Sequence, residues 1–220
     1  MKQLIPLNFQ TLFRKIERHL QDYGVLHTLK RGILYLFRRF YENRIYRIYR
    51  IDLTQFIPKL IEHSEFNFYI LESKNLYRNI IHQIEKMEEW LKDRVESKLK
   101  SGGICLVALD NKKVIGFNLV ALNKIYIPLI NLEKILKPCS AWGEQITVRK
   151  DYRGKGLATQ LRYKIFAELQ KRGIKKFYGG AFIPNIPSLK LTRKVGFEEF
   201  VDLHYSKLFN HKKWNYKRIR

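Results

Sequence analysis

A short glycine-containing segment, residues 148–158, holds the residues best suited to chemistry. It runs from an apolar strand pattern through a basic turn with two glycines into an amphipathic helix pattern. Glycine lets backbone N–H groups approach an anion closely, and the N-terminus of the helix adds its dipole. Arg153 and Lys155 place positive charge beside Gly154 and Gly156. The segment therefore predicts a phosphate-binding site, most simply one for a diphosphate.

Two well-known nucleotide-binding loops do not fit this segment. A P-loop needs Gly-x-x-x-x-Gly followed directly by a lysine and a serine or threonine, and that spacing is absent. A dinucleotide-binding loop needs a third glycine, where this chain has Thr159, and an acidic residue about twenty positions later. Residues 174–181 contain no acidic side chain. Both nucleotide loops are therefore excluded.

The spacing Arg153-x-x-Gly156-x-Ala158 resembles a loop of the GNAT acetyltransferase superfamily, which binds the diphosphate of coenzyme A. A second segment, residues 185–197, resembles the family's Asn-x-x-Ser/Ala-x-x-x-Tyr-x-Lys-x-Gly-Phe pattern. The two segments follow in the family's order, about thirty residues apart, with one helix and one strand pattern between them. The alternative is a generic strand–turn–helix unit with a glycine cap.

The resemblance implies a donor site for acetyl-CoA, bound as a co-substrate without a metal ion. Backbone groups of Ile146 and Val148 would hold the pantetheine arm. Asn185 would contact the pantetheine or acetyl end, with Ser188 nearby. The residues that would hold the diphosphate are those of the loop itself: Arg153, Gly154, Lys155, Gly156, Leu157 and Ala158.

Acetyl transfer from a thioester requires a neutral amine and a route for its proton. Glu144 is the general-base candidate, because the resemblance places it on the family's central strand, where a carboxylate often removes the amine proton through a water. Alternation along a strand predicts that Glu144, Ile146 and Val148 share one face. The alternative is that Glu144 forms an ordinary salt bridge with one of the many lysines.

One position departs from the family pattern. The family's usual general acid, a tyrosine, corresponds to Thr192, and a threonine hydroxyl is a far weaker acid than a phenol with a pKa of about 10. Tyr178, Tyr205 or solvent would then protonate the leaving thiolate. Cys139 is a lesser candidate, as an acyl-carrying nucleophile, against a bystander role, since no histidine lies near it in sequence.

The order of strand and helix patterns resembles the GNAT acyl-CoA N-acyltransferase fold. This is a fold of the α/β (α+β) class, with a mixed central sheet and flanking helices. The predicted strands are 68–71, 104–109, 114–120, 142–148 and 175–182, with further strand from 198 onward. The predicted helices are 75–100, as one or two, 157–171 and 188–194, and residues 123–139 form an insertion.

We expect three parts along the chain. Residues 1–60 are predicted to be a basic amphipathic helical extension, residues 61–209 the acetyltransferase domain, and residues 210–220 a basic tail. The helical spacing covers residues 8–50 and ends in the basic and aromatic run 44–50.

The formal net charge of +23 is concentrated in the two ends of the chain and around the glycine loop. One interpretation is that the N-terminal helices pack on the domain and solvate their basic faces. Another is that residues 1–50 make a peripheral contact with an anionic membrane. Nucleic acid ranks last as a partner, because no nucleic-acid-binding module accompanies the basic and aromatic run.

Composition predicts a folded, cytoplasmic protein. The chain is 45% hydrophobic and 14% aromatic, and it shows no signal peptide. Its two cysteines lack metal-ligand spacing and fit a reducing compartment. The longest apolar run near the N-terminus, residues 33–37, is too short to cross a bilayer. The alternative localisation is peripheral, at the inner face of the membrane.

These features predict an acetyl-CoA-dependent N-acetyltransferase that acts on a primary amine of a small molecule or peptide. An anionic or sugar-linked acceptor suits the basic surface, which repels cationic amines. The alternatives are a binding module of the same fold, with weak or no catalysis, that docks to anionic membrane or nucleic acid, and an acyltransferase that uses a longer acyl-CoA. The sequence does not predict an oligomeric state.

Overall fold

The structure, a computed structural model, describes residues 17, 20, 24–26, 28–30, 32–33, 40–57, 65–72, 78–127 and 132–219. The chain divides into two compact units. One comprises Met1–Arg44 and Tyr205–Trp214, and the other comprises Ile45–His204 and Asn215–Arg220. The candidate site described below lies within the second unit.

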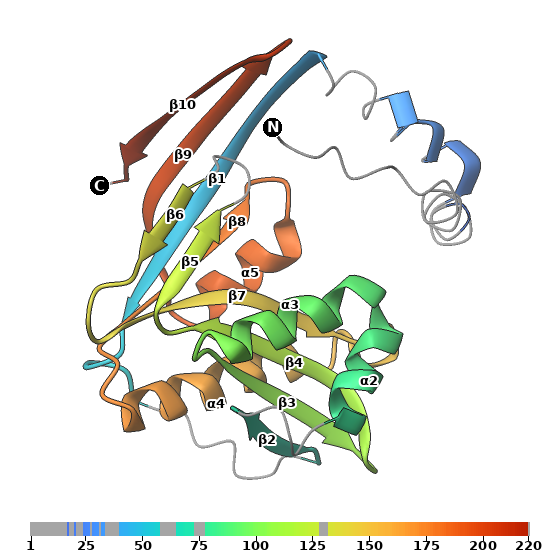
Figure 1. The fold of residues 1–220 in the computed structure, drawn as a ribbon, viewed down its shortest axis with the longest axis vertical. Coiled ribbons are helices and arrows are strands. Elements are labelled where there is room, and N and C mark those ends of the chain that lie inside the picture. The colour runs from blue at the N-terminus through green and yellow to red at the C-terminus, as the bar shows by residue number, and fades with distance from the viewer. Residues whose placement is uncertain are drawn as a thin grey trace. The chain divides into compact units, whose positions relative to one another are not determined.

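The elements follow in the order shown in Figure 1. They are β1 (Tyr41–Asp52), β2 (Asn67–Leu71), α2 (Arg78–Met87), α3 (Glu89–Lys100), β3 (Ile104–Asp110), β4 (Lys113–Ala121), β5 (Lys124–Ile127), β6 (Leu132–Ile135), β7 (Ser140–Val148), η3 (Lys150–Tyr152), α4 (Leu157–Lys171), β8 (Lys176–Phe182), α5 (Ile186–Lys194), β9 (Glu198–Leu208) and β10 (His211–Arg218).

Eight of these strands form one mixed sheet in the order β10-β9-β1-β8-β7-β4-β3-β2. Strands β7 and β8 pair in parallel, while β4 pairs with β7, β3 with β4, and β1 with β8 in antiparallel fashion. Strands β5 and β6 form a separate two-stranded sheet inside the predicted insertion. The predicted mixed sheet with flanking helices is confirmed.

Helices cover both faces of β3 and β4, which explains why these strands read as continuous apolar runs. Alternate residues of β3 enter two different clusters. Ile104, Leu106 and Ala108 pack with buried residues of α4, and Cys105 and Val107 pack with those of α2 and α3. Figure 1 shows α2 and α3 together on one side of these strands. We call these the α4 side and the α3 side of the sheet.

The prediction of helix for residues 41–50 is wrong, because this segment belongs to strand β1. Its partner is β8, with Tyr46 opposite Phe182 and Ile51 opposite Phe177. The three-residue repeat of Arg, Ile and Tyr in this segment imitates helical spacing, but isoleucine and tyrosine also favour strands. The available edge of β8 decides between the two. The described residues between 17 and 33 are helical, as predicted.

The predicted C-terminal tail also contains a strand, β10, whose side chains are all exposed. The predicted helical stretch 75–100 is two helices, α2 and α3. Among the residues that the structure describes, no helix is both long enough and apolar enough to cross a membrane.

Candidate active site

Strands β7 and β8 separate partway along their length. They pair in parallel only from Ser140 opposite Lys176 to Gly143 opposite Gly179. Both strands continue beyond this point, to Val148 and Phe182. We call the facing backbone edges of residues 144–148 and 180–182 the β7–β8 opening, and the last paired position, at Gly143, its apex. Strands β7 and β8 do not pair with each other along the opening, so backbone groups on its facing edges can bind a ligand, except where side chains take them, as Arg94 does at the Glu144 carbonyl.

The predicted phosphate loop lies at the wide end of this opening, between β7 and α4. Gly154 and Gly156 have φ angles of 81° and 77°, in the left-handed region that favours glycine. A Cβ at either position would meet no atom within 4 Å, so conformation and not crowding requires glycine there. Gly156 caps α4, and no side chain caps the N–H groups of its first turn. This helix end is open to an anion.

Neighbouring strands hold the loop in place. Arg153 Nε donates to the carbonyl oxygen of Val148 at 3.0 Å. The hydroxyl of Tyr152 donates to Asp110 Oδ2 at 2.6 Å, at the end of β3, and this bond raises the pKa of Tyr152. The ammonium of Lys155 lies 5.2 Å from the centre of the Tyr152 ring. The exposed Gly154–Gly156 turn is therefore anchored on two strands.

Asn185 and Ser188 lie together where α5 begins, just after β8. Asn185 is the N-cap of α5, and its Oδ1 accepts from the backbone N–H of Ser188 at 3.3 Å. The hydroxyl of Thr192 donates to the carbonyl oxygen of Ser188 at 2.8 Å. The Thr192 hydroxyl therefore already donates its hydrogen bond within the helix, which agrees with its poor suitability as a general acid.

Glu144 lies in a β-bulge that alternation along the sequence did not reveal. Leu119 pairs with Gln145 and Val120 pairs with Gly143, so Glu144 has no partner on β4. The extra residue reverses the alternation. The predicted common face of Glu144, Ile146 and Val148 is therefore wrong: Ile146 and Val148 pack on the α4 side, whereas Glu144 points to α3.

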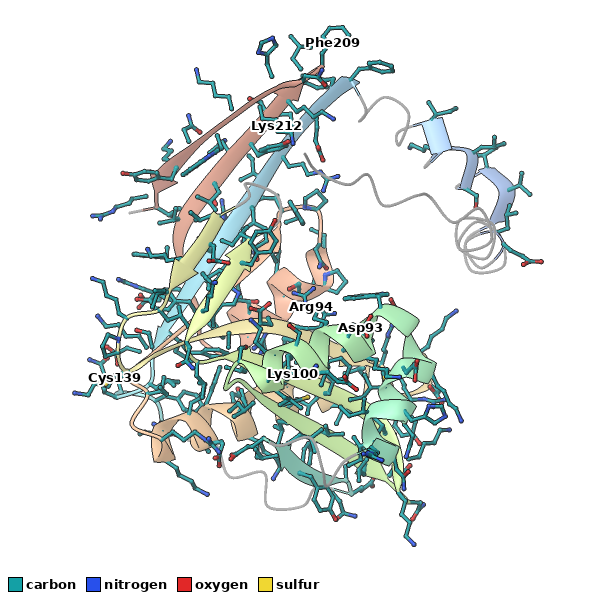
Figure 2. The ribbon with its side chains drawn as sticks, in the orientation of Figure 1. Asp93, Arg94, Lys100, Cys139, Phe209 and Lys212 are labelled. Carbon is teal, nitrogen blue, oxygen red and sulfur yellow. The ribbon has the colours of Figure 1, made fainter. Side chains whose placement is uncertain are left out.

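The Glu144 carboxylate forms two ion pairs with α3. Arg94 Nη2 lies 3.1 Å from Oε2, and Lys98 Nζ lies 2.9 Å from Oε1. The Glu144 side chain is only 6% exposed. Arg94 and its exposed neighbour Asp93 are labelled in Figure 2. The salt-bridge alternative for Glu144 is thus present in the structure, while its role as general base stays a prediction.

A partly buried residue, Tyr46 on β1, lies beside the opening. A Cβ on Gly180 of β8 would overlap the Tyr46 ring, so only glycine leaves room for it. The ring also makes an edge contact with Phe182, with centroids 5.2 Å apart. Burial, and next the negative charge of Glu144, raise the pKa of Tyr46, so its hydroxyl stays protonated. Sequence reasoning missed this residue because it lies in the run that was predicted to end a helical extension.

A second missed residue, Arg162 of α4, lies at the apex on the α4 side. A Cβ on Gly143 would lie 2.9 Å from Nη1 of Arg162. Nη1 also donates to Asn118 Oδ1, over a long 3.4 Å. The guanidinium carbon lies 5.6 Å from the ring centre of Phe177 and 5.9 Å from that of Phe197. Desolvation lowers the pKa of Arg162 to about 10, which leaves it charged at neutral pH.

The other residues considered for proton or acyl transfer lie at different distances from the apex. Tyr178 pairs with Trp142 one position before the apex and packs in the same cluster as Tyr46, so its role as proton donor stays a prediction. Tyr205 belongs to the other compact unit. Cys139 is exposed in the turn before β7, four residues from the apex, or about 13 Å along a strand. Figure 2 shows Cys139 well apart from Arg94 of α3.

Comparison with known proteins agrees with the fold. The acetyltransferase (GNAT) family model matches residues 60–197. The chain therefore belongs to this family of acetyl-CoA-dependent N-acetyltransferases. The matched stretch contains the glycine loop, both segments of the β7–β8 opening and Arg162. No curated protein matches the sequence.

Solved structures of the same fold are distant in sequence. A putative GNAT acetyltransferase from Novosphingobium aromaticivorans shares 12% identity at a TM-score of 0.52, covering 81% of this chain and 66% of its own. A GNAT protein from Sphaerobacter thermophilus shares 17% identity at a TM-score of 0.51, covering 86% and 56%.

A fungal GCN5-related glucosamine N-acetyltransferase region, part of a multi-domain β-N-acetylglucosaminidase, shares 14% identity at a TM-score of 0.55, covering 82% of this chain and 23% of its own. The present chain thus spans less than two thirds of the length of these structures.

Proposed function

We propose that this protein transfers an acetyl group from acetyl-CoA to a primary amine. The observation that carries the proposal is the combination of the β7–β8 opening with an uncapped helix N-terminus at its wide end. An extended thioester with a diphosphate at one end fits such a site. Family membership supports the same co-substrate.

The donor would lie with its diphosphate on the glycine loop. The first N–H groups of α4, at Leu157 and Ala158, would donate to the phosphate oxygens, with Arg153 and Lys155 as mobile cations. The pantetheine arm would follow the free edge of β7 past Val148 and Ile146 toward the apex. Asn185 and Ser188 would face it from the start of α5. This placement puts the thioester near the apex.

Transfer then needs an amine that has lost its proton. Glu144, through a water, is the proposed acceptor of that proton, although its two ion pairs compete for the same oxygens. The amine nitrogen attacks the carbonyl carbon, the C–N bond forms, and the C–S bond breaks as the thiolate leaves. Tyr46, with its protonated phenol, is well suited to hold a polar group of the acceptor or the reacting carbonyl by hydrogen bonding.

The acceptor that we propose is an anionic or sugar-linked amine. The net charge of +23 favours approach of an anionic molecule and disfavours polyamines. The fungal region that shares the fold is a glucosamine N-acetyltransferase, which makes an amino sugar a natural first compound to test.

We also propose that the N-terminal region contacts an anionic membrane. Because residues 41–52 form β1, the proposed contact is confined to the part of the chain before residue 41. Several apolar side chains in its described helical residues are exposed, among them Val25, Leu26 and Ile33. Removal of residues 1–39 should abolish co-sedimentation with anionic vesicles, and unchanged sedimentation would rule the contact out.

A thiol-release assay with acetyl-CoA across a panel of amines tests the enzymatic proposal. The panel should contain amino sugars, nucleotide-linked amino sugars, amino acids, polyamines and basic peptides. We expect release of coenzyme A with at least one anionic or sugar amine. Reaction with polyamines or basic peptides alone would contradict the proposed acceptor class, and binding of acetyl-CoA without transfer to any amine would favour a binding module.

A further inference from the structure

Arg162 carries a charge that no described residue balances. Within the ranges that the structure describes, no carboxylate forms an ion pair with its guanidinium. Its neighbours are a neutral amide, Asn118, and two aromatic rings, Phe177 and Phe197. Arg162 is partly buried. A partly desolvated cation without a partner costs free energy, and an anion that arrives with a ligand offsets this cost.

The place of this cation is informative. It lies against Gly143, the last residue of β7 that pairs with β8, and a side chain at position 143 would collide with it. It also lies on the same helix as the glycine loop. Six residues separate Gly156 from Arg162, which is about 9 Å along the helix axis. One helix thus presents its N-terminus to the diphosphate end of the opening and a guanidinium to the apex.

We propose that Arg162 is a catalytic residue that stabilises the thiolate of coenzyme A as it leaves. The inference rests on the proposed function and adds to it a group for the negative charge on sulfur. A cation beside the thiolate would also make a proton donor at the position of Thr192 unnecessary, since the Thr192 hydroxyl donates to the carbonyl of Ser188.

The step balances without a general acid. The amine nitrogen forms a bond to the carbonyl carbon, and the electron pair of the C–S bond moves to sulfur. The amine proton passes to water or to Glu144, and the thiolate stays paired with the Arg162 guanidinium, which keeps its own protons. Sulfur takes a proton from water after coenzyme A leaves the site. An adjacent opposite charge favours the ionised form of a thiol, by about 1–3 pKa units.

A purely packing role makes the opposite prediction for stability. If Arg162 serves only to fill space between Phe177 and Phe197, its replacement by methionine should lower the melting temperature of the free protein. If the charge of Arg162 is balanced only when a ligand anion binds, Arg162→Met should leave the melting temperature unchanged or raise it, because the substitution removes an uncompensated cation. Thermal unfolding of the ligand-free protein separates the two.

The decisive measurement is the pKa of the thiol of bound coenzyme A, read from the ultraviolet absorbance of the thiolate with protein in excess. In the unaltered protein we expect this thiol to ionise at a proton concentration at least about 10-fold higher than that for free coenzyme A. Arg162→Met should remove the shift and Arg162→Lys should keep part of it. Lys171→Met, which removes an exposed cation from the other end of α4, should not change it.

Desulfo-coenzyme A, which lacks the thiol, separates failure of this inference from failure of the proposed function. Calorimetry should show that it binds the unaltered protein and Arg162→Met equally well. In the amine assay, Arg162→Met should lower kcat about 100-fold with KM for acetyl-CoA within about threefold, the pattern of a group that acts in the transition state.

Two outcomes overturn these claims separately. If neither coenzyme A nor its desulfo analogue binds, the proposed function fails. If both bind and the thiol pKa is the same in the unaltered protein and in Arg162→Met, the role of Arg162 fails while the donor site stands.

Discussion

The two sides of the sheet differ in whether a charged side chain near the apex of the β7–β8 opening forms ion pairs. On the α3 side, Glu144 is nearly buried and holds both Arg94 and Lys98. On the α4 side, the partly buried Arg162 contacts the neutral side chains of Asn118, Phe177 and Phe197. The charge of Glu144 is balanced by other residues of the protein, whereas only a ligand could balance the charge of Arg162. The contrast suggests that the α4 side receives the donor and that the α3 side keeps its shape without one.

The largest effect is expected from a negative charge at the start of α4. Gly156→Glu places a strained side chain and a carboxylate where the diphosphate would bind, and affinity for acetyl-CoA should fall by more than about 100-fold. Isothermal titration calorimetry measures it. Gly173→Glu is the matched control, since Gly173 also has positive φ and open space but lies after the other end of α4. Equal losses in both variants would mean general damage to the fold.

The next effect tests the paired cluster. Glu144→Gln leaves Arg94 and Lys98 without their counter-charge and should lower the free energy of unfolding by about 2–4 kcal/mol. Adding Lys98→Met to this variant should restore part of the loss, as chemical denaturation can show.

The Glu144→Gln variant also tests whether Glu144 acts in catalysis. If Glu144 accepts the amine proton, kcat of the folded fraction should fall about 100-fold and should not return with Lys98→Met. Full activity in the stabilised double variant would leave Glu144 a structural residue.

A smaller effect is expected at the contact between Gly143 and Arg162, on the α4 side. Gly143→Ala adds a Cβ 2.9 Å from Nη1 of Arg162 and 3.2 Å from the Phe177 ring. The guanidinium must move, at a cost of about 1–2 kcal/mol in unfolding free energy. We expect the shift in the thiol pKa of bound coenzyme A to shrink with it. A shift unchanged from the unaltered protein would mean that the exact position of Arg162 is unimportant.

The smallest effect concerns a second cluster of ion pairs, which is formed by Arg47, Arg193, Glu199 and Asp202. Arg47 lies 2.5 Å from Glu199 and 2.7 Å from Asp202, and Arg193 lies 2.9 Å from Glu199. The hydrogen bond from Arg193, the largest favourable cause, and that from Arg47 lower the pKa of Glu199 from 4.5. The stabilisation from the ion pairs of Glu199 is therefore present above pH 4.5 and is lost as the pH falls through the lower pKa of Glu199 in the folded protein.

Glu199→Gln should consequently reduce stability by about 1 kcal/mol at neutral pH and flatten its decline in acid. Urea unfolding at several pH values between neutrality and the acid limb provides the measurement. A variant whose stability falls with acid as steeply as that of the unaltered protein would show that Glu199 contributes little.

Much of the proposed donor site could be predicted from the sequence. The glycine loop depends on two residues whose backbone angles suit glycine, and such local requirements are visible in a single chain. Strands β3 and β4 are apolar throughout because helices cover both of their faces, so their runs were recognisable. The cap formed by Asn185 is likewise local, since its partner is three residues away.

The charged groups of the apex could not be predicted. Arg162 appeared only as one basic residue on an amphipathic helix, and nothing in its neighbours shows that it meets Gly143. Tyr46 lies in a run whose spacing suits a helix, and only pairing of β1 with β8 makes it a strand residue. Glu144 could be selected from the sequence, but the face of the sheet to which its side chain points could not, because a bulge leaves no trace in the alternation of apolar and polar residues.

By itself the sequence determined the family, the glycine loop and the order of the central elements, because these depend on neighbours along the chain. Only the tertiary structure decided which charges are paired. Glu144 meets residues fifty positions away on α3, and β1 enters the sheet beside a strand that forms far later in the chain. Such contacts follow from the packing of the whole sheet, and so does the solitary charge of Arg162.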